Sequence, residues 1–170
     1  MKITPNSGDD FEAFIELLAP VGHSIIAVGD YRVAGCLLKL RDQIDLIAPD
    51  RSKFADGTIG DKAHRSIKSD HNPHIRDGEI GVVTALDITH DPANGCNVCR
   101  IVEALRASED PRIKYVIFNH QIFSSYAWEG IPPWELRSYA GSNSHEQHVH
   151  ISCLGQKELY DSEESWHLGY

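Results

Sequence analysis

Apolar residues recur at helical spacing in three stretches of this 170-residue chain. Positions three and four apart share one face of a helix, so each stretch predicts an amphipathic helix. The three predicted helices cover about 9–19, 34–47 and 97–107. The buried face of the second helix would carry four apolar residues, Leu37, Leu40, Ile44 and Ile47.

Other stretches alternate between apolar and polar residues or are rich in β-branched residues, as is typical of strands. The predicted strands cover about 24–28, 81–88, 113–118 and 147–153. Asp87 lies in the second of them, where a carboxylate is costly to bury unless a charged or hydrogen-bonding group meets it. In the last strand, His148 and His150 would project from one face while apolar residues pack behind.

Two longer segments lack either periodicity. Residues 51–76 are polar and turn-rich, which predicts a surface loop, and functional residues often gather in such loops. Residues 124–144 hold Trp128, Trp134 and Tyr139 in irregular sequence. This segment could pack over or beside a site, or its aromatic residues could simply fill the core.

Composition narrows the class of protein. Hydrophobic residues make up 41% and charged residues 24%, as in an ordinary globular protein of one domain. The net charge of −9 argues against a nucleic-acid partner. No apolar run approaches the roughly 20 residues of a membrane span, so no membrane partner is expected. The first ten residues lack the apolar segment of a secretion signal, so we expect a chain that is cytoplasmic as synthesised.

Four cysteines are present: Cys36, Cys96, Cys99 and Cys153. Cys96 and Cys99 have the C-x-x-C spacing of a zinc knuckle or a redox pair. A second pair of ligands at matching spacing is missing, and so is a thioredoxin-like context. We therefore expect structural thiols in a reducing compartment.

Three side chains form a candidate metal set: His71, Asp87 and His150. Two histidines and one carboxylate are a common catalytic zinc set that leaves a fourth position for water. Bound zinc lowers the pKa of that water to about 7 and polarises a carbonyl. The plainer alternative is a polar sheet face that carries two ordinary histidines, because short motifs have a high false-positive rate.

Three motifs follow one another along the chain: Ser69-Asp70-His71, Ala85-Leu86-Asp87 and His145-Glu146-Gln147-His148-Val149-His150. They resemble the zinc peptidases of the D-Ala-D-Ala carboxypeptidase and L-alanyl-D-glutamate endopeptidase group. The wider stretches 69–73, 83–87 and 141–145 also resemble phage and prophage-type members of that group. That group shares its fold with the hedgehog signalling domain and with the penicillin-insensitive murein endopeptidases. The resemblance covers about residues 41–153.

The resemblance implies an α+β fold, hedgehog/DD-peptidase-like, with an antiparallel sheet and helices packed on one side. We expect one zinc-peptidase-like domain over residues 1–170, with residues 1–33 as an N-terminal extension outside the motif region.

The resemblance also implies roles for single residues. Zinc would be bound by His71, Asp87 and His150. His148 would orient water or stabilise the oxyanion, and His145 would lie next to the metal. The general base stays open between His145, Glu146 and His148, because position 147, where many carboxypeptidase members carry glutamate, is Gln147.

The chain departs from the family pattern in two places. Sixteen positions (87 − 71) separate the first histidine from the aspartate, whereas about seven are usual in the family. We therefore expect an insertion within 72–84. A longer loop adds little to the free energy of loop closure, so both of its ends can stay in place. Alternatively, His74 is the true ligand. The family's arginine before Ser-x-His is matched best by Arg65 and less well by Lys68, and a solvated surface arginine is the alternative.

The sequence therefore predicts a zinc metallopeptidase that hydrolyses peptide bonds in bacterial peptidoglycan stems or cross-links. The alternative is a catalytically inactive, metal-binding fold-mate that serves as a cell-wall or protein-binding module, since a shared fold does not establish chemistry. Without an export signal, such an enzyme would reach the cell wall through a lysis partner, as a phage lysin does, or would act on recycled wall peptides.

Overall fold

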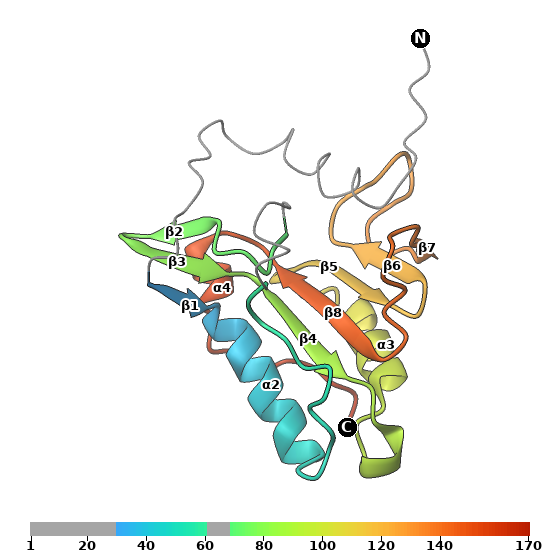
Figure 1. Ribbon diagram of the computed structural model, residues 1–170. Coiled ribbons are helices and arrows are strands. Elements are labelled where there is room, and N and C mark those ends of the chain that lie inside the picture. The colour runs from blue at the N-terminus through green and yellow to red at the C-terminus, as the bar shows by residue number, and fades with distance from the viewer. Residues whose placement is uncertain (1–29, 61–68) are drawn as a thin grey trace.

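The computed structural model describes residues 30–60 and 69–170 (Figure 1). The predicted helix over 9–19 and strand over 24–28 lie outside these residues. The elements in chain order are β1 (Tyr31–Val33), α2 (Gly35–Ile47), β2 (Ile75–Asp77), β3 (Ile80–Val83), β4 (Ala85–Thr89), the 3-10 helix η3 (Pro92–Asn94), α3 (Val98–Ser108), β5 (Ile113–Phe118), β6 (Gln121–Ser124), β7 (Arg137–Ser138), β8 (His148–Cys153) and α4 (Lys157–Tyr160).

A five-stranded antiparallel sheet forms the centre of the protein, in the order β4-β8-β5-β6-β7. Helices α2 and α3 contribute buried residues to the same core cluster as one face of this sheet, and Figure 1 shows both helices beside β4 and β8. The other face carries the polar positions of β4 and β8. The predicted mixed α+β class with an antiparallel sheet is confirmed.

The predicted strand over 81–88 is wrong as a single element, because the chain changes sheets at Thr84. The carbonyl of Val83 accepts a hydrogen bond from Ala34, whereas the carbonyl of Thr84 accepts one from Cys153 in β8. Strand β3 therefore belongs to a small sheet of order β1-β3-β2, in which β1 runs parallel to β3, and β4 is an edge strand of the large sheet. Residues Tyr31–Val33, expected within the N-terminal extension, form β1.

The insertion within 72–84 forms a β-hairpin rather than an irregular loop. Asp77 pairs with Ile80 across a two-residue turn, and Gly78 in that turn has a φ of +63°, which a residue without Cβ adopts at no steric cost. Strands β2 and β3 thus lengthen the connection while both of its ends stay at the large sheet.

Helix α2 agrees with the predicted helix at both ends within a residue. Leu37, Leu40 and Ile44 are buried as predicted, but Ile47, the last helical residue, is 39% exposed. Helix α3 also follows its prediction, and the side chain of Asn97 accepts a hydrogen bond from the Cys99 amide at its N-terminus.

The sequence patterns did not predict β6, which forms a hairpin with β5. The turn residues Asn119 and His120 both have positive φ, 48° and 61°, the combination that a type I′ hairpin turn requires. Of the segment 124–144, Ser124 ends β6 and Arg137–Ser138 forms the strand β7 at the sheet edge.

All four cysteines are free thiols, and Cys36, Cys96 and Cys153 are buried while Cys99 is exposed. The Cys96 thiol donates to the carbonyl of Thr89 at 3.3 Å, so the two members of the C-x-x-C motif lie in different environments. Within residues 30–60 and 69–170, none of the helices has the length and apolar character needed to cross a membrane.

Candidate metal centre

Strand pairing brings Asp87 and His150 together although they lie 63 residues apart in sequence. In the antiparallel ladder of β4 and β8, these two residues are direct partners, and such partners have Cβ atoms about 4.5–5.5 Å apart. His150 Nδ1 lies 3.1 Å from Asp87 Oδ1. Asp87, a carboxylate in an apolar strand, was expected to need a charged or hydrogen-bonding partner. His150 is that partner.

His71 reaches the same point from the loop before β2. Its backbone amide donates to Ser69 Oγ at 3.3 Å, and its carbonyl accepts from the amide of Gly60 at 3.0 Å. These two contacts fix the backbone from which the imidazole extends. His71 Nε2 lies 3.1 Å from His150 Nδ1 and 3.3 Å from Asp87 Oδ2.

The spacing of these three side chains fits one metal ion. Nitrogen and oxygen ligands of zinc lie about 2.0–2.1 Å from the ion in a tetrahedral site, so two ligand atoms should be about 3.3 Å apart. The two imidazole nitrogens lie 3.1 Å apart, His150 Nδ1 lies 3.1 Å from Asp87 Oδ1, and His71 Nε2 lies 3.3 Å from the other carboxylate oxygen, Oδ2. Among the residues that the structure describes, His71, Asp87 and His150 are the group of such side chains that could hold a metal ion.

The hydrogen bonds on the far side of each imidazole support the same conclusion. His71 Nδ1 lies 2.8 Å from the carbonyl oxygen of Thr58, which can only accept, so this nitrogen carries the proton and Nε2 is left with a lone pair. His150 Nε2 lies 2.9 Å from Ser152 Oγ, and its Nδ1 faces the group. Ser152 Oγ can accept a proton from Nε2, which leaves the lone pair of His150 Nδ1 facing His71 and Asp87, an arrangement that could hold a cation.

Without a metal ion, the carboxylate of Asp87 favours a proton on His71. Burial alone would lower the pKa of His71, but the hydrogen bond and charge of Asp87 outweigh it and raise that pKa. Burial alone would raise the pKa of Asp87, but His150 and His71 hold it well below its usual range. Burial lowers the pKa of His150 despite the nearby carboxylate. Asp87 is therefore ionised and ready to bind a cation.

Sequence reasoning missed the segment 51–60, which packs along the open edge of β4. Gly57 and Asp87 exchange backbone hydrogen bonds at 2.8 and 3.2 Å, and the next residue, Thr58, provides the carbonyl that holds His71. One segment thus supports two of the three candidate ligands. The polar, turn-rich composition of 51–76 predicted a loop but not this contact.

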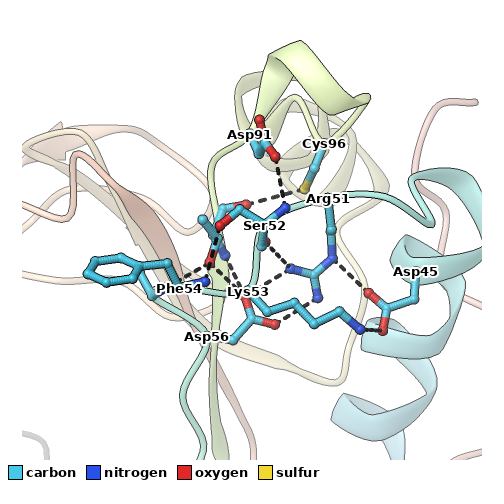
Figure 2. A network of polar contacts seen from close by, with 10 residues as sticks. Asp45, Arg51, Ser52, Lys53, Phe54, Asp56, Asp91 and Cys96 are labelled. Carbon is cyan, nitrogen blue, oxygen red and sulfur yellow. Dashed lines mark hydrogen bonds and ion pairs between the residues drawn. The ribbon is translucent and has the colours of Figure 1, made fainter.

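A buried arginine fixes that segment in place. Figure 2 shows the Arg51 guanidinium between the carboxylates of Asp45 and Asp56, which it contacts at 2.7 Å each. The Arg51 side chain is fully buried. Asp56 in turn accepts from the Thr89 amide and hydroxyl at 2.9 and 2.8 Å, which ties the segment to the end of β4.

His145 and His148 lie next to the candidate metal ligands. The ring centroid of His145 is 4.9 Å from that of His148 and 5.7 Å from that of His150. His145 Nδ1 lies 2.7 Å from the carbonyl oxygen of Asn143, so Nδ1 carries the proton and Nε2 can accept one. Burial, together with the neighbouring His150 and His148, lowers the pKa of His145 to about 4. At neutral pH this imidazole is uncharged.

Glu146 lies in a different environment from the other candidate bases. Strand β8 begins at His148, so strand alternation does not bring Glu146 onto the face of the histidines. Its side chain is 62% exposed, and its carboxylate pairs with His120 Nε2 at 3.0 Å and with the Ser144 hydroxyl at 3.3 Å.

Two further expectations concern the segment before β2. His71, rather than His74, joins Asp87 and His150, and His74 is exposed. Arg65 and Lys68 lie outside the described residues.

Comparisons with known proteins returned no match. No protein-family model, no curated protein and no solved structure matches this chain.

Proposed function

We propose that this protein is a zinc-dependent metallopeptidase that hydrolyses peptide bonds of bacterial peptidoglycan. The observation that carries the proposal is the convergence of His71 Nε2, Asp87 and His150 Nδ1 at separations of 3.1 to 3.3 Å. Zinc is the ion of choice because two imidazoles and one carboxylate are a common catalytic zinc set with a fourth position for water.

Bound zinc would acidify a water molecule and polarise the substrate carbonyl. The residues around it would supply the rest of the reaction. His145, neutral at pH 7 with Nε2 unprotonated, would accept a proton and return it to the leaving amine. His148 would donate a hydrogen bond to the developing oxyanion.

The substrate class rests on the resemblance of three motifs to the D-Ala-D-Ala carboxypeptidase and L-alanyl-D-glutamate endopeptidase group. The motifs end at His71, Asp87 and His150, the same three residues that converge. Three motifs far apart in sequence that meet at one point are a more specific sign than any one of them. The finer fold proposal, hedgehog/DD-peptidase-like, rests on the same resemblance together with the antiparallel sheet.

The test is incubation of the purified protein with peptidoglycan, before and after treatment with a chelator, followed by mass analysis of the released peptides. We expect peptide products, loss of activity on metal removal, and recovery with one equivalent of zinc. His150→Ala should lose both metal and activity, because it removes a ligand. His148→Ala should keep the metal and lose most turnover. His167→Ala, at an exposed histidine near the C-terminus, is the control and should change neither.

The alternative, an inactive binding module, makes a different prediction. Glu146 is exposed and paired with His120. If catalysis requires a carboxylate as base, this position of Glu146 favours the inactive binding module. A protein that holds one zinc per chain and binds peptidoglycan, yet releases no chelator-sensitive product, would establish the module and rule out the peptidase. Equal behaviour of the His150 and His148 variants would show that their roles are assigned wrongly.

A further inference from the structure

A chain of polar side chains leads away from the metal ligand His150 into the sheet. His150 Nε2 lies 2.9 Å from Ser152 Oγ, two residues further along β8. Burial would raise the pKa of the nearby Asp70 carboxyl, but Lys114 and, after it, a hydrogen bond from the Ser152 hydroxyl lower that pKa. Both oxygens of that carboxylate accept from Lys114 Nζ, at 2.9 and 2.8 Å. Asp70 is the middle residue of the Ser-x-His motif, and the proposed function gives it no role.

Burial and proton counting fix the direction of every bond in this chain. The Ser152 side chain is inaccessible to solvent and His150 is 5% exposed, so water does not offer these groups alternative partners. An ionised carboxylate only accepts and an ammonium only donates, so the single hydroxyl proton of Ser152 goes to Asp70. Ser152 Oγ is then left to accept, and His150 must be protonated at Nε2. The lone pair of His150 therefore sits on Nδ1, which faces His71 and Asp87.

We propose that Ser152 and Asp70 are positioning residues that fix the tautomer and ring orientation of His150 for metal binding, with Lys114 balancing the charge of Asp70. The inference rests on the metal site of the proposed function. Hydrogen bonds that hold a ligand histidine from behind typically change metal affinity by about 10–100-fold when they are removed. Here the Asp70 carboxylate holds the His150 ring through the Ser152 hydroxyl rather than by direct contact.

The test compares Ser152→Ala with the wild-type protein in three measurements. Zinc affinity, measured by competition with a chromophoric chelator, should fall by about 10–100-fold. The visible bands of the cobalt(II)-substituted protein should shift, because the orientation of one ligand changes. In the wild-type zinc form, nitrogen chemical shifts of His150 should show a metal on Nδ1 and a proton on Nε2, and the variant should lose this single pattern.

Two further variants separate positioning from mere packing. Ser152→Thr keeps the hydroxyl and should restore most of the zinc affinity. Ser124→Ala is the matched control, because Ser124 is equally buried and flanks Tyr115 from β6 as Ser152 does from β8. It should lower stability to a similar degree as Ser152→Ala and leave zinc affinity and the cobalt spectrum unchanged.

The outcomes distinguish this inference from the proposed function. A wild-type protein that binds zinc and cleaves peptidoglycan, with a Ser152→Ala variant of unchanged affinity and cobalt spectrum, would overturn the inference alone. Equal losses of zinc affinity in Ser152→Ala and Ser124→Ala would overturn it as well, since packing would explain both. A wild-type protein that binds no divalent metal would overturn the proposed function and the inference together.

Discussion

His145 has a left-handed backbone conformation, with a φ of 54°, which costs a residue with a Cβ about 1–2 kcal/mol. Two contacts with Asn143 hold it there: its amide donates to Asn143 Oδ1 at 3.1 Å, and its Nδ1 donates to the Asn143 carbonyl at 2.7 Å. Its carbonyl accepts from the Asn119 amide in the β5–β6 turn. Strain maintained by surrounding contacts is typical of functional positions.

We predict that His145→Gln lowers kcat by about 10²–10⁴-fold, the usual contribution of a general base. The zinc content should stay at one per chain, because His145 is outside the group that could hold the metal. Steady-state kinetics on a peptidoglycan fragment and metal analysis of the same sample measure both effects. His120→Gln, at an exposed histidine in the β5–β6 turn, serves as the control. A His145→Gln variant with full turnover would exclude His145 as the base.

Glu146→Gln provides the counterpart to that experiment. The carboxylate is exposed and paired with His120, so its replacement resembles an ordinary surface substitution, which changes stability by no more than about 0.5 kcal/mol. We expect kcat and zinc content close to those of the wild-type protein. A loss of turnover similar to that of His145→Gln would return Glu146 to the role of base.

At the scale of elements, the segment 51–60 and strand β4 act as one unit in supporting the metal group. The segment is linked to helix α2 through Arg51 and Asp45 (Figure 2). It is linked to the end of β4 through Asp56 and Thr89. Its Gly57 pairs with β4 at Asp87. Because Thr58 follows directly, the position of the His71 ring depends on this attachment.

We predict that Arg51→Met destabilises the protein by about 3–5 kcal/mol, since it leaves two carboxylates without the buried partner that balances them. Urea unfolding of the metal-free protein measures the change. Lys53→Met is the matched control, because Lys53 binds the same Asp45 but is 54% exposed, and an exposed pair contributes about 1 kcal/mol or less. Similar losses in the two variants would show that burial of Arg51 is not the decisive factor.

The turn of the β2–β3 hairpin, which forms the insertion, is expected to require glycine at position 78. Gly78→Ala should cost about 1–2 kcal/mol because of its positive φ, although a Cβ there would meet no other atom within 4 Å. Gly35→Ala, in the first turn of α2, should be neutral or stabilising, because alanine is favoured over glycine in helices. Thermal unfolding compares the two variants. Equal effects would mean that the turn tolerates a side chain.

For the whole molecule, buried or half-buried arginines connect segments that are distant in sequence. Arg112 pairs with Asp110, donates to the carbonyl of Glu164 at 2.6 Å, and stacks 3.8 Å from the ring centroid of Trp166. It thereby attaches the C-terminal segment to the start of β5. Each such arginine needs an ionised carboxylate. The fold should therefore lose stability at acid pH, where carboxylates become protonated.

We predict that the free energy of unfolding of the metal-free protein falls steeply below about pH 4, the usual range of carboxyl pKa values. Burial alone would raise the pKa of Asp56 and of Asp110, but hydrogen bonds from Arg51 and Arg112 outweigh it and lower both. A folded-state pKa below the unfolded one gives stability that is complete above the unfolded pKa and is lost as pH falls through the folded one.

Denaturant unfolding at a series of pH values measures this dependence. Asp56→Asn should be less stable than the wild-type protein at pH 7 and should lose less stability between pH 5 and pH 2, because it lacks one of the carboxylates that must be protonated. Parallel curves for the two proteins would show that Asp56 does not contribute to acid sensitivity.

Much of the fold follows from local patterns. The apolar spacing of Leu37, Leu40 and Ile44 predicts α2 to within a residue of its ends, and the alternation around His148 and His150 predicts β8. These elements can be predicted because their apolar side chains recur with the period of the helix or strand backbone. The residue types of the candidate metal set were likewise recognisable from their motifs.

Only the tertiary structure decided how these parts meet. The break at Thr84, the pairing of Asp87 with His150 and the contact of segment 51–60 with β4 all arise from hydrogen bonds between residues 30 or more positions apart. Such contacts leave no local period in the sequence, because a backbone amide or carbonyl is present in every residue type. Local chemistry determined which side chains can bind a metal. Strand register brought Asp87 and His150 together, and loop contacts with residues 58–60 brought His71 to them.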